Sequence, residues 1–174
     1  RTKDTKTFSN LSDTVARKVD QGMITSVARR GERFVIDDEK QVYLDVLFPD
    51  RDVTNVESNN ASIVLRLSYL DFCVILTGDA SKQIEQHVIS MEGDNLDCDV
   101  LKVGHHGSRT STGEKFVEIV SPKYAVISSR KNNSYGHPHK EVLSILQKLD
   151  VSILRTDEVG RIELESNGVE FIVK

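Results

Sequence analysis

Three segments in the second half of the sequence share a pattern that limits the folds open to this chain. Each is a short apolar run that leads into a polar turn containing glycine, and a helical stretch follows the turn. The apolar runs are residues 72–76, 99–103 and 124–128, and helices are expected over residues 79–91, 112–120 and 138–149. Buried strands that alternate with helices predict an α/β domain with helices packed on a mixed sheet.

The first half of the sequence predicts antiparallel structure instead. A helix is expected from Ser9 or Asn10 to Gly22, because apolar residues recur there every four positions. A long polar loop, residues 49–60, interrupts the strands that follow. Strands are expected over residues 23–29, 33–36, 41–48 and 62–69, with a terminal hairpin of residues 161–165 and 169–173. The sheet is therefore expected to be antiparallel at its ends.

Length and composition fit a single globular domain. The chain has 174 residues, of which 38% are hydrophobic and 29% charged. No segment approaches the roughly 18 consecutive apolar residues of a membrane span, and the polar N-terminal residues do not resemble a signal peptide. Because the chain begins with Arg1 instead of Met, we expect a cut upstream. Cys73 and Cys98 each lie in an apolar run and are expected to be buried thiols.

The charge of the chain is unevenly distributed. The formal net charge is −4, which argues against a protein that binds nucleic acid over its whole surface. Residues 102–140, however, hold seven basic and two acidic residues, a net charge of +5, while the remainder carries −9. Four of the five histidines fall in the same segment. An anionic ligand is therefore expected to bind there.

The candidate site residues follow the three apolar runs and should meet at one edge of the sheet, where ligands of α/β sheets collect. Asp79 is either the N-cap of the next helix or a metal ligand. His105 and His106 are adjacent and can face one site only through a sharp turn, for which Gly104 and Gly107 provide freedom. His137 either lies at the start of a helix without a functional role or binds metal as a neutral imidazole. His87 and His139 are expected to face solvent.

Four motifs occur in a fixed order along this part of the chain. They are Leu76-Thr77-Gly78-Asp79, Asp99-Val100-Leu101-Lys102-Val103-Gly104-His105-His106-Gly107-Ser108, Asn133-Ser134-Tyr135-Gly136-His137-Pro138, and Arg155-Thr156-Asp157 with Gly160. In this order they closely resemble the C-terminal metallo-β-lactamase-like domain of ComEC-type competence proteins. The resemblance runs from about residue 59 to residue 162. Its Gly-His-His-Gly-Ser element is specific, whereas Thr-Gly-Asp alone is not.

The resemblance implies a metal-dependent hydrolase, a nuclease or phosphodiesterase linked to DNA uptake, with two Zn²⁺ or Mn²⁺ ions in the complete domain. Asp79 would bridge the two metals, and His137 would complete the shell of the second. A metal-bound hydroxide would attack phosphorus, while His105 or His106 would assist at a phosphate oxygen or the leaving group. The residues expected to hold the DNA phosphodiester are Lys102, Ser108, Arg109, Asn133 and Tyr135.

The chain also departs from this family. The signature His-x-His-x-Asp-His, or its variant His-x-Asp-x-Asp-His, is missing, and no histidine precedes His87. We therefore expect residues 1–174 to be one partial domain, the C-terminal part of a larger αββα sandwich. Alone, it should bind metal weakly or not at all and hydrolyse nothing. Its apolar sheet edges should be exposed unless a homodimer or a swapped contact covers them.

The resemblance also bears on the parent protein and leaves other functions open. It implies a soluble domain outside the cytoplasm, in a bacterial membrane protein that carries a channel domain in the same chain. The alternative to an enzyme is a non-catalytic module that binds DNA or a protein partner and retains a degenerate metal site. A β-lactam or thioester hydrolase on the same scaffold is a third possibility, against which the basic segment and the histidine pair both weigh.

Overall fold

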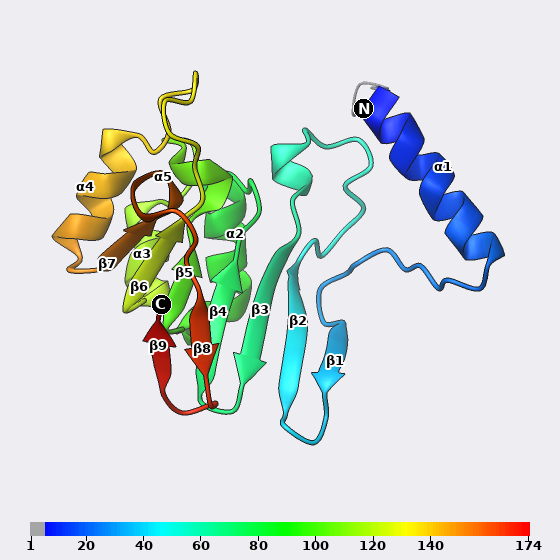
Figure 1. The fold of residues 1–174 in the computed structure, drawn as a ribbon, viewed down its shortest axis with the longest axis horizontal. Coiled ribbons are helices and arrows are strands. Elements are labelled where there is room, and N and C mark those ends of the chain that lie inside the picture. Colours follow the sequence, from blue (N-terminus) through cyan, green and yellow to red (C-terminus); the bar gives the residue numbers. More distant parts are fainter. Residues whose placement is uncertain (1–5) are drawn as a thin grey trace.

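The structure is a computed structural model that describes residues 6–174. A seven-stranded mixed sheet forms its centre, and the strands lie side by side in chain order (Figure 1). They are β1 (Arg33–Asp37), β2 (Val42–Phe48), β3 (Val64–Tyr69), β4 (Phe72–Leu76), β5 (Val100–Lys102), β6 (Tyr124–Ile127) and β7 (Ser152–Arg155). Neighbouring strands are antiparallel from β1 to β4 and parallel from β4 to β7. The expected α/β class and mixed sheet are confirmed, but only one end of the sheet is antiparallel.

Three helices form a layer on one face of the parallel strands (Figure 1). They are α2 (Lys82–Glu92), α3 (Glu114–Val120) and α4 (Lys140–Lys148). Each connects two parallel strands, as the crossover between such strands requires. The core between helices and sheet includes fully buried side chains from both layers, among them Ile75, Leu101, Ile127, Val88, Phe116 and Leu146. This core fixes the strand ends from which the candidate site loops leave.

A short hairpin covers part of the opposite face of the sheet. It consists of β8 (Leu164–Ser166) and β9 (Phe171–Val173), which follow the short helix α5 (Thr156–Val159). The ring of Phe171 lies 4.9 Å from that of Phe72 and 5.5 Å from that of Tyr124, measured between centroids. The hairpin expected from the sequence is confirmed, although it forms a separate sheet. The parallel strands are thereby buried on both faces.

The N-terminal segment differs from its prediction in two ways. Helix α1 (Lys6–Asp20) begins before Ser9 and Asn10, so neither of them caps it. Residues 23–29 form no strand, because they run apart from the sheet with Ile24 94% and Val27 70% exposed. Figure 1 shows α1 standing away from the sheet at the end of this segment.

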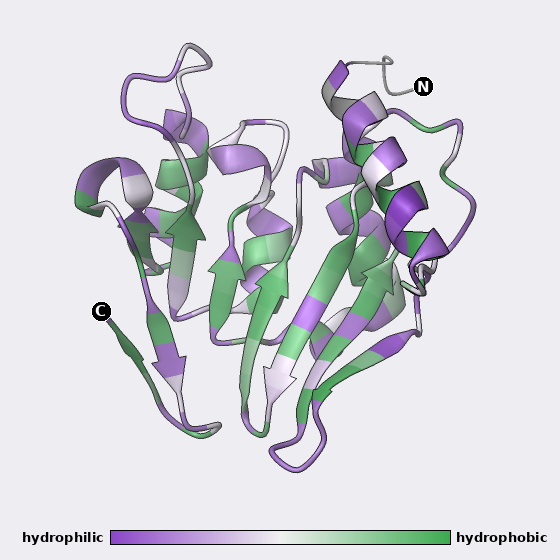
Figure 2. Ribbon diagram, turned by 45° about the vertical axis from the view of Figure 1, so that its right-hand side comes forward, coloured by the Kyte–Doolittle hydropathy of each residue, from purple (hydrophilic) through white to green (hydrophobic). Residues whose placement is uncertain are grey.

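The antiparallel edge of the sheet exposes apolar side chains. Phe34, Val35 and Ile36 on β1 are all exposed, in agreement with the expectation from the sequence. The hydrophobic colouring of Figure 2 continues along the strands to this edge. Within residues 6–174, no helix has the length and apolar character needed to cross a membrane.

The three helices of the layer start two or three residues later than predicted. Helix α2 begins at Lys82 instead of Asp79, α3 begins at Glu114 instead of Thr112, and α4 begins at Lys140, after Pro138. In each case the additional residues belong to the turn that leaves the strand. These longer turns carry the candidate site residues.

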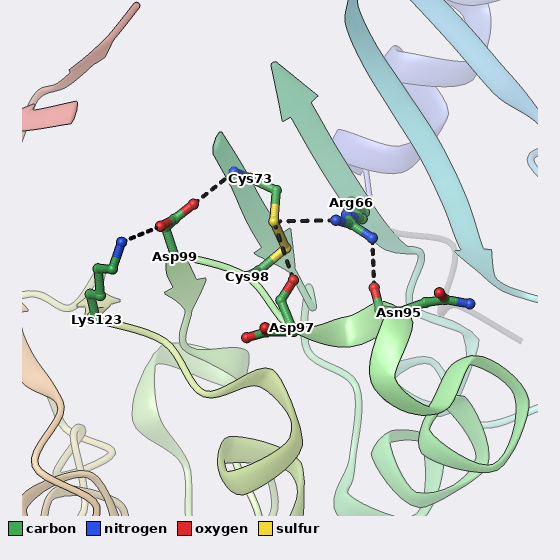
Figure 3. Close-up of a disulfide and its surroundings, with 7 residues drawn as sticks. All are labelled: Arg66, Cys73, Asn95, Asp97, Cys98, Asp99 and Lys123. Carbon is green, nitrogen blue, oxygen red and sulfur yellow. Dashed lines mark hydrogen bonds and ion pairs between the residues drawn. A yellow bond between two sulfur atoms is a disulfide. The ribbon is translucent and has the colours of Figure 1, made fainter. Parts of the chain in front are cut away.

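Cys73 and Cys98 form a disulfide, so the prediction of two buried thiols was wrong (Figure 3). The bond joins β4 to the residues just before β5, at the amino ends of these parallel strands. Arg66 donates a hydrogen bond from Nη2 to the Cys73 sulfur at 3.5 Å and another to the carbonyl of Asn95 at 2.6 Å. The disulfide therefore lies at the end of the strands opposite the candidate site.

Candidate functional site

The predicted site residues follow three neighbouring parallel strands. In the register of the sheet, Leu76 of β4 lies opposite Lys102 of β5, which lies opposite Val126 of β6. The turns after these strands are residues 77–81, the 3₁₀ turn η3 (Gly104–Gly107) and residues 128–139. Because the strands are parallel, all three turns leave from the same edge of the sheet. The sequence correctly predicted this arrangement.

An imidazole cluster forms where these turns meet. The ring centroids of His105 and His137 are 5.6 Å apart, and those of His137 and His139 are 4.8 Å apart. Tyr135 stacks on His137 with ring centroids 5.7 Å apart and the two planes inclined by 23°. His137 therefore has three aromatic or imidazole rings as neighbours.

The cluster keeps His137 in its neutral form. Partial burial lowers the pKa of the His137 imidazole, and the positive charges that His139 and His105 can carry lower it further. Neutral imidazole is the form that binds a metal ion or accepts a proton. Asn133 also holds this segment, since its Oδ1 accepts the His137 N–H at 3.0 Å and its Nδ2 donates to the His137 carbonyl at 2.6 Å.

The sequence suggested that His139 faces solvent, but the structure shows otherwise. It is half-buried, and its Nδ1 accepts the backbone N–H of Arg109 at 3.1 Å. The prediction failed because His139 is the N-cap residue of α4, next to the η3 loop, instead of an interior residue of the helix. The other histidine expected in solvent, His87, is half-buried as well, and its Nε2 lies 2.9 Å from Oδ2 of Asp50.

The two adjacent histidines of η3 point to different places because of an unusual backbone. Both have left-handed conformations, with φ of 47° at His105 and 57° at His106. His106 places Nδ1 2.7 Å from the carbonyl of Ser128, whereas His105 faces His137. The sequence correctly predicted a sharp turn, but the histidines themselves adopt most of the strained conformations.

Gly107 is required in this turn for steric reasons. Its φ is 84°, and a Cβ atom at this position would lie 2.5 Å from Cβ of Pro138. Any side chain at residue 107 would therefore push apart the η3 turn and the segment that carries His137. The close approach of these two backbones brings His105 and His137 together.

Asp79 lies on the turn beside His105. The carbonyl of Gly78, its neighbour, accepts the His105 N–H at 3.0 Å, and the Asp79 N–H donates to Oγ of Ser62 at 3.1 Å. The N-cap of α2 is Ser81, so Asp79 does not cap this helix. Burial lowers the pKa of the Lys102 ammonium, and the negative charge of Asp79 opposes this effect. The carboxylate of Asp79 is thus close enough to attract the ammonium group of Lys102.

The residues predicted to bind substrate differ in accessibility. Tyr135 is 77% exposed and Arg109 is exposed. Ser108 is buried and its hydroxyl is 3.0 Å from that of Thr110, while Nζ of Lys102 donates to the carbonyl of Val103 at 3.0 Å. Tyr135 and Arg109 therefore face solvent in this conformation, and Ser108 does not.

A cavity of about 630 Å³ opens beside the imidazole cluster. The segment after β6 forms most of its wall, and His106 from η3 completes it. The lining residues are His106, Ser128, Ser129, Arg130, Asn132, Asn133, Ser134, Tyr135 and His137. Cationic, imidazole, amide and aromatic groups thus surround one open space.

Sequence reasoning missed the contribution of the loop over residues 49–61 and of Glu85. Asn60 in this loop accepts a hydrogen bond from Oγ of Ser81 at 2.5 Å, and Ser62, the residue directly after the loop, accepts the Asp79 N–H at 3.1 Å. The loop and the residue that follows it therefore fix the Asp79 turn. The side chain of Glu85 is buried on α2 beside Ile84 and Val88. A carboxylate at a buried position of an amphipathic helix was the signal that could have identified it.

The residues that the structure describes do not form a complete metal site. Within residues 6–174, no group of three or more His, Cys, Asp or Glu side chains is arranged to hold a metal ion. Metal centres of hydrolases need at least three protein ligands each. Asp79 and His137, the two metal ligands expected from the sequence, are fewer than such a centre requires.

Comparisons with known proteins were made for the sequence and for the fold. No family model matches the sequence. It is 42% identical over 144 residues to ComE operon protein 3 of Bacillus subtilis, covering 83% of this chain and 18% of that protein. It is 38% identical to competence protein ComA of Neisseria gonorrhoeae over 63% of this chain and 16% of that protein. The chain is homologous to competence proteins.

Other comparisons extend this relationship. Recombination protein 2 of Haemophilus influenzae is 32% identical over 71% of this chain and 15% of its own length. The chain thus spans less than a fifth of each of these competence-related relatives. A solved Parabacteroides distasonis structure, assigned as a metal-dependent hydrolase, has a TM-score of 0.51 and 15% identity, covering 82% of this chain and 61% of that one. This likeness concerns the fold, an α/β arrangement of mixed sheet and helices.

Proposed function

We propose that this chain is the C-terminal part of a metallo-β-lactamase-like αββα domain in a competence protein, and that this domain hydrolyses DNA phosphodiesters. The observation that carries the proposal is the meeting of the Asp79 turn, His105 and His137 at one edge of the sheet. Homology to competence proteins and the fold similarity to an assigned metal-dependent hydrolase support it.

The proposed metal centre draws part of its ligands from this chain. Asp79 provides a carboxylate and His137 a neutral imidazole, both suited to Zn²⁺ or Mn²⁺. When bound, such ions lower the pKa of a water molecule towards neutrality and so supply a nucleophile. The remaining ligands would come from a segment that precedes this chain in the longer protein.

The proposed substrate-binding surface is the cavity beside His137. His106 and Arg130 provide donors for phosphate oxygens, and the exposed ring of Tyr135 provides a face on which a base can stack. Exposed Arg109 adds positive charge at the edge of the imidazole cluster. The net charge of +5 over residues 102–140 favours a polyanion at this surface.

The second candidate function is a non-catalytic module that binds DNA or a protein partner. The lack of a three-ligand group within residues 6–174 is the observation that favours it. The two functions differ in whether upstream residues complete the metal shell.

The disulfide supports a location outside the cytoplasm. Disulfides persist in oxidising compartments and are rare where cellular reductants keep thiols reduced. Cys73 and Cys98 are both more than nine-tenths buried in the core beneath the sheet, which suits a structural bond. We therefore propose that this domain lies outside the cytoplasm. The family resemblance adds the proposal that the parent is a membrane protein with a channel domain elsewhere in the same chain.

The test is cleavage of a labelled DNA strand by the complete protein in the presence of Mn²⁺ or Zn²⁺. Asp79→Asn should reduce the rate by at least about a hundredfold, because a ligand that bridges two cations is lost. The matched control is Asp94→Asn. Asp94 is an exposed carboxylate on the 3₁₀ turn η2 (Gly93–Leu96), so this variant should cleave DNA at the normal rate. Full activity of Asp79→Asn would refute the metal role. DNA binding without cleavage by the unaltered protein would favour the non-catalytic module.

A further inference from the structure

The carboxylate of Glu85 is buried between α2 and the segment before α3, and the proposed function does not use it. Glu85 is 2% exposed. Its Oε1 accepts the backbone N–H of Thr112 at 2.5 Å, and its Oε2 accepts that of Gly113 at 2.8 Å. One side chain on α2 therefore binds two successive amides of the segment that links η3 to α3.

The backbone that Glu85 binds is strained. Thr112 has a φ of 56°, in the left-handed region that β-branched residues rarely adopt. Such conformations persist only where the surrounding structure imposes them. The two hydrogen bonds from Thr112 and Gly113 to the carboxylate provide that constraint, since both donors are buried and need a partner within the protein.

Other hydrogen bonds join the same segment to the turn that carries Asp79. The Lys82 N–H donates to the carbonyl of Thr110 at 2.8 Å, and the buried hydroxyl of Ser111 donates to the carbonyl of Ala80 at 2.7 Å. At the other end of the loop, His105 donates to the carbonyl of Gly78. Residues 105–113 are thus attached to the turn after β4 at Gly78 and Ala80 and to the first turn of α2 at Lys82 and Glu85.

We propose that Glu85 is a positioning residue, whose ionised carboxylate holds residues 108–113 in place and thereby sets His105 and Arg109 against the Asp79 turn. The proposal rests on the proposed function, because it assigns Glu85 to the same site. Glu85 itself touches only the backbone of the loop and takes no part in the chemistry.

The protonation state of Glu85 regulates this attachment. Burial raises the pKa of Glu85 to about 7, although the bonds from Gly113 and Thr112 and the charge of Lys82 oppose the shift. A protonated carboxyl has one good acceptor oxygen instead of two, so one of the two amides loses its partner. Lys82 is the cation that acts on Glu85 from its own helix. On the facing segment the nearby charged residue is Glu114, whose Oε1 pairs with Nζ of Lys148 on α4 at 2.5 Å.

The test is nuclear magnetic resonance of the 174-residue chain without metal or substrate. Between about pH 5 and about pH 9, the carboxyl ¹³C signal of Glu85 and the amide signals of Thr112 and Gly113 should shift together, with one inflection near pH 7. In Glu85→Gln the amide inflection should disappear, hydrogen exchange of Thr112 should accelerate at least about tenfold, and the His105 ring signals should move. The matched control is Glu118→Gln, on the exposed face of α3, which should leave all of these unchanged.

Two results would overturn the proposal. One is a Glu85 carboxyl that titrates without any response of the two amides in the unaltered chain. The other is a Glu85→Gln variant with normal Thr112 exchange and unmoved His105 signals. If the variant does not fold, the titration of the unaltered chain still decides. Because neither measurement involves DNA or metal, failure of the proposed hydrolase activity would not affect them.

Discussion

The two halves of the central sheet differ in how they are covered. The parallel half, from β4 to β7, has helices on one face and the β8–β9 hairpin against part of the other. The antiparallel half ends at β1 with Phe34, Val35 and Ile36 exposed. All the candidate site residues lie in the parallel half. This chain therefore builds its site on its well-packed part, while its antiparallel edge contributes little to its own core.

The same substitution in the two halves should have very different effects on stability. Ile75 on β4 is fully buried, whereas Ile36 on β1 is 60% exposed. Ile75→Ala should lower the free energy of unfolding by about 4 kcal/mol, because it removes buried methylenes and leaves a cavity. Ile36→Ala should change it by less than about 0.5 kcal/mol. Urea unfolding measures both, and similar losses would contradict the contrast between the halves.

Removing the disulfide tests how the parallel half is held together. The bond closes a loop with a sequence separation of 25 residues. Replacing Cys73 and Cys98 by Ala should lower the free energy of unfolding by about 3 kcal/mol, because the unfolded chain gains conformational freedom. The control is addition of a reductant, which should destabilise the unaltered chain and leave the double variant unaffected. If the reductant left the free energy of unfolding of the unaltered chain unchanged, the disulfide would not contribute to stability.

Glu85 should make the parallel half sensitive to pH. Its pKa is about 7 in the folded chain, above the ordinary value of 4.5, so the folded state binds the proton more tightly than the unfolded state does. Although the ionised carboxylate makes both amide bonds, burying its charge costs more than these bonds return. The contribution of Glu85 to stability is therefore complete below pH 4.5 and is lost as the pH rises through 7. Between about pH 5.5 and about pH 7.5 the loss should be about 2 kcal/mol.

The pH effect is best measured as a difference between two proteins. Unfolding of the unaltered chain and of Glu85→Gln is followed in urea at both pH values, so that effects of other titrating groups cancel. The advantage of the unaltered chain over the variant should shrink as the pH rises. A difference that stays constant with pH would mean that Glu85 titrates normally in the folded chain.

The sequence predicted the parallel half better than the antiparallel half, for physical reasons. Strands β4, β5 and β6 are buried on both faces and read as continuous apolar runs bounded by glycine turns, so their positions were found within about two residues. Residues 23–29 also contain apolar side chains, Met23, Ile24 and Val27, but have no neighbouring strand to pair with. Pairing depends on distant parts of the chain, and local composition does not report it.

The candidate site was partly predictable for the same reason. The placement of Asp79, His105 and His137 at one edge follows from strand direction alone, which the apolar runs reveal. The contacts of His139 and Glu85 depend on how the turns fold back on α2 and α4, and the disulfide depends on the pairing of β4 with the start of β5. These are distances in space, which residue spacing along the chain does not determine.

The disulfide has one more consequence for the opposite end of the sheet. In a parallel pair, a strand that slips by two residues keeps its inward-facing side chains inward, so burial alone does not forbid the slip. Such a slip would carry the Asp79 turn about 7 Å along β5 and away from His105. The bond between Cys73 and Cys98 forbids it, because it ties β4 to the start of β5 in one register. The alignment of Asp79 with His105 is thus set six residues before the carboxylate and seven residues before the imidazole, at the far ends of their own strands.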